Sequence, residues 1–397
     1  MQVILGVLFH FIGGFASGSF YIPYKKVKGW HWESYWIVGG LFSWLIVPPL
    51  AAWLTIPGFA EIIKTTGTST LFITFFFGLL WGIGGLTYGL GVRYLGVSLG
   101  SSIILGLCMV FGALIPSIYY DFSPVFVKNA FGEMVAAKDT FSGMIGSDWG
   151  LIVLAGLVVC ILGIIICGKA GMMKEKQLKA EGMVAKLTES HGVETKTEYK
   201  FALGMTVAII SGVLSACFNF GLEAGQSMGA VANEEWKALN PGEGEFLYRN
   251  NVIYVVLLWG GLTTNFIWCM ILNARNKTFG DYTNKKTPLF SNYMFAALAG
   301  TTWFLQFFFY GMGESKLGNG PSSWILHMAF IILVANMWGI ILKEWKGVSK
   351  KTARTIAVGI ITIILAVVIV GIGNNRHEKL KEQQKKDLSY VNSNNKI

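Results

Sequence analysis

Charged residues are scarce in this chain of 397 residues: Asp, Glu, Lys and Arg make up 14% of it, and 53% of its residues are hydrophobic. A soluble domain of ordinary composition carries about 25% charged residues. The low charge therefore excludes the common soluble classes, and the surplus of apolar side chains must face lipid rather than water. Because each bilayer span takes about 20 apolar residues, the chain has room for ten spans and for no sizeable soluble domain.

The motifs of several enzyme and binding classes are also missing. The five Cys residues form no CxxC pair and lie in or beside apolar runs, so we expect neither a disulfide framework nor a zinc site. HExxH, Walker A and GxGxxG after a strand are all missing, so no metal, nucleotide or other cofactor is expected. The basic residues behind the net charge of +10 lie in short clusters between apolar runs, which argues against a nucleic-acid surface.

Long apolar runs are what the sequence does contain. Their ranges are 1–22, 35–54, 71–92, 98–119, 149–168, 201–222, 252–272, 293–312, 322–342 and 355–373. Each run is continuous over about 20 residues rather than alternating over about ten, which predicts helices and excludes a barrel. The first run has no basic segment before it and no cleavage site, so we expect a span rather than a signal peptide. The predicted fold class is an all-α integral membrane protein with ten transmembrane helices.

The basic residues between the runs predict the orientation. With the N-terminus outside, twenty Lys and Arg residues fall on the inner side and twelve on the outer side, six of those twelve in the tail after 373. Because short inner loops are enriched in Lys and Arg, both termini are expected outside. The segment 169–200 is expected to be a charged inner linker, and 375–397 a basic tail, both facing water or lipid headgroups.

Two internal alignments indicate a repeat. A shift of 222 positions aligns the third run with the eighth, and a shift of 198 aligns the first with the sixth. The identical pairs are Trp81/Trp303, Tyr88/Tyr310, Gly89/Gly311, Gly91/Gly313, Leu95/Leu317, Gly96/Gly318, Gly6/Gly204, Gly14/Gly212, Ser17/Ser215 and Phe20/Phe218. Each half, 1–168 and 201–374, holds five helices, an odd number, so the second crosses the membrane in the opposite sense. Two inverted five-helix repeats of this kind place a substrate site between the halves and allow alternating access.

Ionisable side chains inside the runs are few, and each costs about 2.5 to 3.5 kcal/mol when it faces lipid. His10 and His327 lie in the first and ninth runs, and an imidazole can exchange a proton at physiological pH. The alternative is a structural His that bonds a neighbouring helix. Acidic side chains occur only at the ends of runs. Glu33 is expected at the interface and is a further candidate for proton binding, Glu344 is also expected at the interface, and Glu223 and Glu314 are candidates to line an outer vestibule.

Aromatic and amide side chains indicate where a sugar-sized solute would bind, because its ring needs flat apolar faces and its hydroxyl groups need polar partners. Trp303, Gln306 and Tyr310 share one helix face, and Ser323 and His327 share another. Such aromatics also serve as packing or as interfacial belts, and buried Asn as a bond between helices. The candidate binding residues are Trp81, Tyr88, Asn219, Trp303, Gln306, Tyr310, Ser323 and Trp324. The glycine pairs Gly78/Gly82, Gly85/Gly89 and Gly96/Gly100 predict close helix packing.

A different class, a membrane-embedded serine hydrolase, has weak support. The sequences GVSLG (96–100) and GQSMG (225–229) match GxSxG, with Ser98 and Ser227 as nucleophiles. A nucleophile elbow needs a strand before it and a helix after it, and neither match follows a strand pattern. No catalytic residue is therefore expected.

Four longer motifs carry a family resemblance. They are PYKKVKGWHWESYW (23–36), LLWGIGGLTYGLGVRYLG (79–96), WFLQFFFYGMG (303–313), and SSWILHMAF (322–330) followed by LKEW (342–345). They resemble the bacterial L-rhamnose proton symporter family of the drug/metabolite transporter superfamily, whose members are ten-helix carriers. The resemblance extends from Val7 to about Gly373. The positions that match the family are His10, Glu33, Trp81, Gly82, Tyr88, Arg93, Gln306, Tyr310, Ser323, Trp324 and His327.

The resemblance implies sugar transport by symport: L-rhamnose, or a similar deoxy sugar, enters across the bacterial inner membrane together with a proton. The expected partners are this sugar, the proton and the lipid bilayer. A carrier that exports or exchanges another small metabolite is the alternative. Proton coupling is expected at His10, His327 and Glu33.

Overall fold

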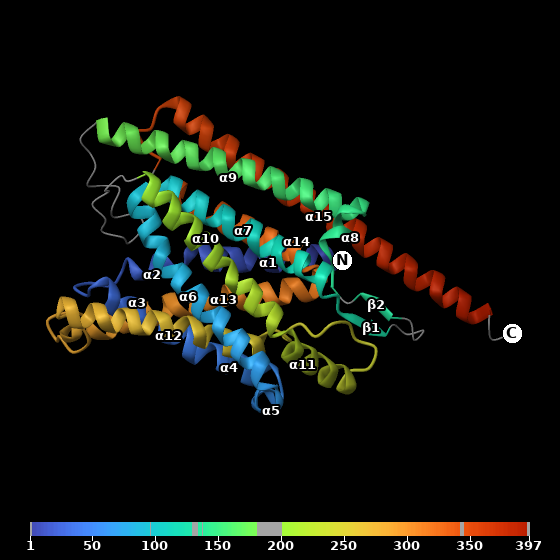
Figure 1. The fold of residues 1–397 in the computed structure, drawn as a ribbon. Coiled ribbons are helices and arrows are strands. Elements are labelled where there is room, and N and C mark those ends of the chain that lie inside the picture. Colours follow the sequence, from blue (N-terminus) through green and yellow to red (C-terminus); the bar gives the residue numbers. More distant parts are fainter. Residues whose placement is uncertain are drawn as a thin grey trace.

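A computed structural model describes residues 2–95, 97–128, 134–136, 138–180, 201–341 and 345–394, and its long helices lie side by side (Figure 1). The elements before the central gap are α1 (Gln2–Ser19), α2 (Tyr21–Tyr24), α3 (Trp32–Gly40), the π-helix η1 (Leu41–Ile46), α4 (Val47–Thr55), α5 (Phe59–Thr65), α6 (Thr68–Leu95), α7 (Val97–Phe122), β1 (Phe126–Lys128), β2 (Met134–Ala136), α8 (Phe141–Ile145) and α9 (Asp148–Ala180). After the gap follow α10 (Phe201–Ala224), α11 (Gln226–Leu239), α12 (Asn251–Asn276), the 3-10 helix η3 (Phe279–Tyr282), α13 (Leu289–Leu317), α14 (Gly320–Ile341) and α15 (Lys350–Asn394).

Nine helical segments in the described part of the chain are long and apolar enough to cross a membrane. They correspond to nine of the ten apolar runs, so the prediction of a helical membrane protein is confirmed. The run 293–312 lies in α13, a tenth long helix that is not among the nine. This helix carries Trp303, Gln306 and Tyr310, the polar and aromatic side chains that the sequence singles out for binding.

The second run forms one helix, in which α3, η1 and α4 follow one another without a break. The π-helix η1 is a widened turn within this helix. Pro48 and Pro49 stand in the first turn of α4. A proline has no N–H to donate and clashes with the carbonyl group one turn before it, which favours a π-type turn there. The turn places Trp44 of η1 in the core, where its side chain is 1% exposed.

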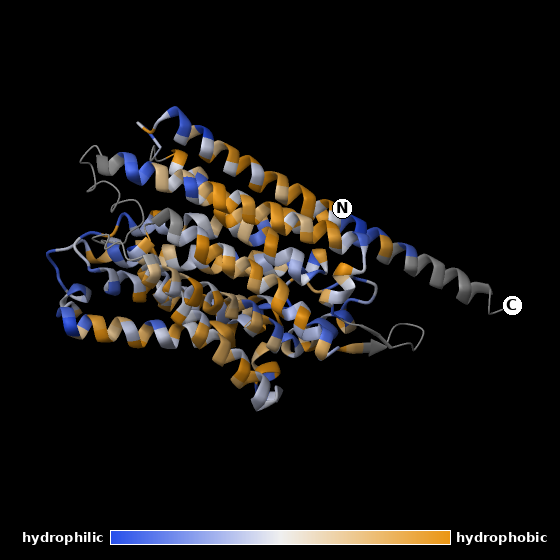
Figure 2. Cartoon of the chain, turned by 45° about the horizontal axis from the view of Figure 1, so that its top comes forward, coloured by the Kyte–Doolittle hydropathy of each residue, from blue (hydrophilic) through white to orange (hydrophobic). Residues whose placement is uncertain are grey.

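Hydrophobic residues run along most of the length of the long helices, as the hydropathy colouring of the ribbon shows (Figure 2). Large hydrophobic residues such as Ile4, Trp53, Leu54 and Phe290 are each more than 60% exposed. A soluble protein rarely exposes apolar side chains over so wide an area. The outer surface of the long helices is therefore the surface that contacts lipid.

The predicted segment boundaries need correction at two places. Helix α9 continues to Ala180, twelve residues past the predicted end of the first half at 168, and α15 continues through the predicted tail to Asn394. These two helices pack along each other at one edge of the bundle (Figure 1). The remainder of the predicted linker, 181–200, and Glu344 lie outside the described residues.

The bundle of described helices has two distinct ends. One end holds η3 and the loop between α2 and α3, and we call it the inner end, following the charge count. The opposite end holds α11, the antiparallel pair of β1 and β2, and the start of α1 (Figure 1). We call this the outer end. The short strands were not predicted, because three-residue strands leave no periodic pattern.

Candidate functional site

Two histidine side chains meet inside the bundle. His10 of α1 is fully buried, His327 of α14 is 3% exposed, and their ring centroids are 6.0 Å apart. The ring of Tyr310 of α13 lies beside both, at 5.4 Å from His10 and 5.2 Å from His327. Neither imidazole faces lipid, and three helices from both ends of the sequence converge on the pair.

Glycines on α1 and α13 explain how the helices come so close. A Cβ atom on Gly313 would lie 2.7 Å from Nε2 of His10, and one on Gly13 would lie 3.1 Å from Cε1 of His327. A side chain at either position would therefore displace an imidazole. The small residues of the first run allow this close packing. The sequence alone could not show which helix packs against them.

Several polar atoms at this site have no hydrogen-bond partner within the described part of the chain. They are both ring nitrogens of His10, Nδ1 of His327, Nε2 of Gln306 and the hydroxyl group of Ser323. All four side chains are at most 5% exposed. An unpaired buried polar group costs about 1 to 3 kcal/mol of stability. Several such groups close together therefore destabilise the protein unless a solute or a proton binds to them. The atoms comprise donors and acceptors, as a hydroxylated ring requires.

Other predicted binding residues fix the surrounding helices. Asn219 of α10 donates through Nδ2 to the carbonyl group of Gly112 at 2.7 Å and accepts from the hydroxyl group of Tyr310 at 3.5 Å. Trp324 donates through Nε1 to the carbonyl group of Cys108 at 3.1 Å. These bonds join α10 and α14 to α7 and orient the aromatic face of Trp324 toward Tyr310, 5.9 Å away.

An aromatic cluster continues from this site toward the middle of the bundle. The rings of Trp81 and Trp303 are 6.2 Å apart, and Trp44 lies 6.2 Å from the first and 5.2 Å from the second. Phe218 and Phe307 stack at 4.4 Å beside them. The sequence analysis missed Trp44, Phe218 and Phe307. Phe218 had one signal, its alignment with Phe20, whereas the other two lie in runs so rich in aromatics that no pattern marks them.

Two predicted site residues lie elsewhere. Tyr88 donates to the hydroxyl group of Ser101 at 2.7 Å and packs against a small separate cluster that contains Ile104. Glu33 is 4% exposed at the inner end, where it accepts hydrogen bonds from Asn276 at 3.0 Å and Thr278 at 2.9 Å. In the described part of the protein neither residue contacts the histidine pair, so the structure does not bring these candidates together with it.

A hydrogen-bonded network at the inner end is centred on Asp281 of η3. Its Oδ2 accepts from the backbone N–H of His31 at 2.8 Å and from the hydroxyl group of Ser34 at 2.8 Å, and it lies 3.0 Å from Nδ1 of His31. Burial alone would raise the pKa of this carboxyl group, but the bonds from His31 and Ser34 lower it below its usual 3.8. The network fixes the start of α3 to the loop after α12.

Stability at low pH should report this network. Because the folded-state pKa of Asp281 is lowered, its contribution to stability is complete above 3.8 and disappears as the pH falls through the lowered value. Asp281→Asn is therefore expected to lower the thermal midpoint of the purified protein at pH 7 and to leave it nearly unchanged near pH 2. A difference between variant and parent that does not shrink on acidification would contradict this role.

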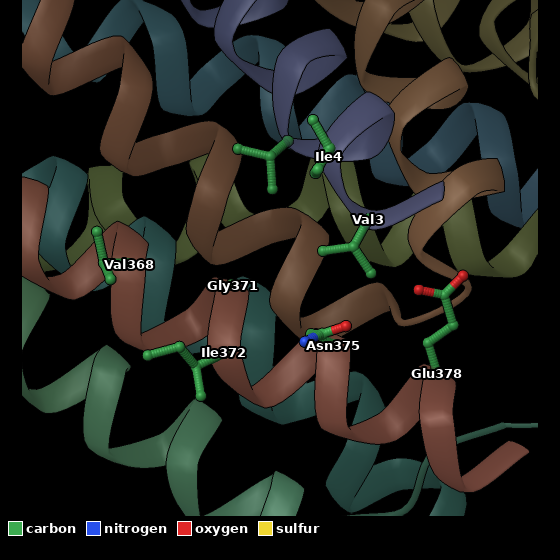
Figure 3. Close-up of a pocket in the computed structure, with 8 residues that line it drawn as sticks. Val3, Ile4, Val368, Gly371, Ile372, Asn375 and Glu378 are labelled. Carbon is green, nitrogen blue, oxygen red and sulfur yellow. The ribbon is translucent and has the colours of Figure 1, made fainter. Parts of the chain in front are cut away.

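A groove of about 390 Å³ lies between α1 and α15 (Figure 3). Its lining is mainly aliphatic and consists of Val3, Ile4, Val7, Val368, Gly371, Ile372, Asn375 and Glu378. Ile4 and Ile372 are more than half exposed, so the groove opens on the surface that contacts lipid. It shares no residue with the histidine pair or the aromatic cluster and is not the candidate site. Among the described residues no group of three or more His, Cys, Asp or Glu could hold a metal ion.

Nine membrane-spanning candidates around a buried cluster of polar and aromatic side chains define a multi-pass membrane protein of the carrier class. The chain belongs to the family described as L-rhamnose-proton symport protein (RhaT), which matches residues 1–376. The family is one of transporters rather than enzymes. The GxSxG matches agree with this, because Ser227 lies in α11 directly after another helix, α10.

Curated relatives give the same result over nearly their full length. The chain is 34% identical over 376 residues to the L-rhamnose-proton symporter of Yersinia pestis (strain Pestoides F), covering 94% of this chain and 98% of the relative. It is 35% identical, with the same coverage of both, to the L-rhamnose-proton symporter of Pectobacterium atrosepticum. The resemblance inferred from the four motifs is confirmed.

Proposed function

We propose that the protein is a proton-coupled secondary transporter that imports L-rhamnose across the bacterial inner membrane by alternating access. The observation that carries the proposal is the convergence of His10, His327 and Tyr310 with the unpaired polar atoms of Gln306 and Ser323, in a chain of this family. The polar atoms suit the hydroxyl groups of a sugar, and the aromatic cluster suits its apolar ring face. The histidines suit a proton that is taken up on one side and released on the other.

Ten transmembrane helices in two inverted five-helix repeats are part of this proposal. The helix contacts support them, because they occur in matched pairs: α1 packs on α13 and α14, and α10 packs on α6 and α7. Exchanging each helix for its repeat partner, α1 for α10, α13 for α6 and α14 for α7, converts the first set of contacts into the second. The α9–α15 contact is converted into itself.

Individual contacts support the repeat at the level of side chains. A Cβ atom on Gly6 would lie 2.7 Å from Cγ of Leu317, and one on its partner Gly204 would lie 2.7 Å from Cγ of Leu95. The shifts of 198 and 222 positions relate these two pairs. Likewise the ring of Phe20 lies 4.6 Å from Trp303, and the ring of Phe218 lies 5.3 Å from Trp81. Random similarity between Gly-rich runs would not reproduce the same contact twice.

The two halves differ in how tightly the equivalent positions pack. At the outer end a Cβ atom on Gly311 would meet the hydroxyl group of Tyr254 at 3.0 Å, whereas on its partner Gly89 nothing lies within 4 Å. Tyr310 is 1% exposed, and its partner Tyr88 is half-buried. Such a difference between matched positions is what alternating access requires, and here it corresponds to a closed outer half and a looser inner half.

Thiol labelling should detect this difference. In a background without the five native Cys, which are all buried, Gly89→Cys is expected to react with a membrane-impermeant maleimide in inside-out vesicles. Ser315→Cys, a nearly isosteric change at a buried outer position, should stay unreactive when the same reagent is added to right-side-out vesicles, which expose the outer face. Equal labelling of both positions would contradict the assignment of open and closed halves.

Gln306 should contribute to sugar binding. Its Nε2 is buried and has no partner among the described residues, and one lost hydrogen bond to a ligand corresponds to about 1 to 3 kcal/mol, or about 5- to 150-fold in affinity. Gln306→Ala is therefore expected to raise the apparent KM for L-rhamnose within that range while the protein still inserts in the membrane. An unchanged KM would remove Gln306 from the site.

Uptake of labelled L-rhamnose into membrane vesicles, with and without an imposed pH gradient, tests the function as a whole. An inward proton gradient is expected to drive accumulation above the outside concentration. Release of sugar from loaded vesicles under the same gradient would instead indicate an exporter, and accumulation that ignores the gradient would exclude proton coupling.

A further inference from the structure

Glu314 is a buried carboxyl group near the outer end of α13, and the proton assignment above does not use it. Its side chain is 4% exposed. Its Oε2 accepts one hydrogen bond, from Nδ2 of Asn250 at 2.5 Å. Within the described ranges it takes part in no salt bridge with a Lys, Arg or His nitrogen. A buried carboxylate without a cation costs several kcal/mol, whereas the neutral acid does not carry this penalty.

The amide that bonds Glu314 gives an independent indication of its protonation. Oδ1 of Asn250, the other end of the same amide, is buried and has no hydrogen-bond partner among the residues described. The hydroxyl group of Tyr254, buried next to Gly311, is unpartnered as well. An ionised carboxylate only accepts hydrogen bonds, whereas the neutral acid has an O–H group to donate. Oδ1 of Asn250 is therefore a free acceptor that only the protonated form of Glu314 can use, whereas the hydroxyl group of Tyr254 can pair with either form.

The cations around Glu314 are bound to other carboxylates. Arg249 pairs with Glu245 at 2.9 Å, and Lys138 pairs with Glu223 at 2.8 Å. The titratable and charged groups that face Glu314 are Arg249 and Tyr254 of α12 and the turn before it, Glu223 of α10, Tyr120 of α7, Lys138 of the outer loop, Tyr310 of α13 and His10 of α1 beside Gly313. In the described part of the chain neither cation forms an ion pair with Glu314 itself, and both favour its ionised form only from a distance.

The position of Glu314 links its protonation to the closed outer half. It follows Gly311 and Gly313, which pack against Tyr254 and His10, and it precedes Ser315, whose hydroxyl group donates to the carbonyl group of Phe246 at 3.2 Å. Separation of α13 from α12 would admit water to this carboxyl group and remove the cost of its ionised form. Closure would restore that cost.

We propose that Glu314 is a proton-binding residue of the outer gate and that the outer end closes over its substrate only when this carboxyl group is neutral. The inference rests on the proposed transport function. It differs from proton coupling at the histidines, because Glu314 stays buried while the inner half is open and therefore keeps its proton there. Alkaline conditions outside would hold the outer end open by ionising Glu314.

Exchange of labelled for unlabelled L-rhamnose across proteoliposomes tests the proposal, because exchange needs both gates to move but no net proton transfer. With the inside held at pH 7, the parent protein should lose exchange about tenfold per pH unit once the outside pH exceeds the midpoint of Glu314, as the neutral fraction falls. Glu314→Gln and Glu314→Met, whose side chains are neutral at every pH, should keep exchange constant over the same range. Glu314→Asp should keep the pH dependence.

Glu61→Gln serves as the matched control, because it removes an exposed carboxylate of α5 that pairs with Lys64 and is not among the groups that face Glu314, and it should retain the pH profile of the parent. Identical profiles for the parent and both neutral variants would overturn the proposal. Failure of both neutral variants to reach the membrane would also overturn it, because a neutral group is what the closed outer end requires. If instead the parent exchanges no L-rhamnose at any pH, the proposed function itself fails.

Discussion

His327→Ala and His10→Ala are each expected to abolish proton-driven accumulation of L-rhamnose, so that the sugar inside only equals the sugar outside and the medium no longer turns alkaline during uptake. An inward gradient of one pH unit supports about a tenfold accumulation for one coupled proton, and this factor should fall to about one. The physical reason is that both imidazoles are buried, and that both ring nitrogens of His10 and Nδ1 of His327 have no hydrogen-bond partner in the described structure and can bind a proton or the solute. Accumulation ratio and external pH are measured together in the same cells.

Two controls separate proton binding from packing. Phe330→Ala removes a buried ring that packs against the ring of Phe11 of α1, 5.5 Å away and close to the histidines, and it should slow transport while accumulation stays coupled to the gradient. His327→Gln preserves much of the side-chain volume without an exchangeable charge, and it should behave like His327→Ala. Full accumulation and full alkalinisation in both His10→Ala and His327→Ala would exclude the histidines as proton carriers.

The distance between the rings also limits how many protons they hold. Two unit charges 6.0 Å apart repel by about 3 kcal/mol at an effective dielectric constant of 20. A second proton on the pair is therefore disfavoured by roughly 100-fold in binding, and the pair titrates as a unit. One proton per sugar is the expected stoichiometry, which the ratio of alkalinisation to labelled uptake measures.

The helices and the membrane class could be predicted from the sequence because they depend on local properties. Continuous apolar runs can be recognised without knowledge of the neighbouring helices. The positions of His10 and His327 could be predicted as well, because a polar side chain in an apolar run is conspicuous. Their mutual contact could not, since it depends on Gly13 of α1 facing His327 and Gly313 of α13 facing His10, contacts between helices far apart in the sequence.

The sequence does not define the site completely, because residues of the same type can lie in different surroundings in the fold. Tyr88 and Tyr310 are aligned by the proposed repeat, yet Tyr310 contacts His10, whereas Tyr88 donates a hydrogen bond to Ser101. Trp44 enters the core through a widened turn at Pro48 that no hydropathy pattern reports. Glu33 is buried by partners 243 and 245 positions away along the chain, a separation over which sequence spacing carries no information.

The glycine pairs of α6 show the same limit and provide the second large effect. Gly78 and Gly82 do pack against α12 as predicted, whereas the prediction of close packing at Gly85 and Gly89 is wrong for this structure, because nothing lies within 4 Å of either. Gly100 packs against the backbone of Gly91, and Gly96 lies outside the described residues. One helix thus carries tightly packed and open glycines a short distance apart.

Gly78→Ala is expected to destabilise the protein by at least about 2 to 3 kcal/mol, at the upper end of the cost of overpacking. The added Cβ atom would lie 2.0 Å from the carbonyl oxygen of Leu257 and 3.1 Å from Cα of Gly260. Both are backbone atoms, so no side-chain rotation relieves the clash and α6 must move away from α12. Thermal melting of the detergent-solubilised protein and its yield in the membrane should both fall.

Gly85→Ala is the matched control, because it makes the same change in the same helix with no atom within 4 Å of the new methyl group. Alanine favours helix over glycine by about 1 kcal/mol, so this variant should be as stable as the parent or slightly more stable. The two substitutions share every intrinsic effect on α6, and their difference therefore measures the contact with α12 alone. Equal melting temperatures for Gly78→Ala and Gly85→Ala would mean that α6 and α12 are not in backbone contact, and the aromatic cluster that this contact holds against Trp81 would lose its structural basis.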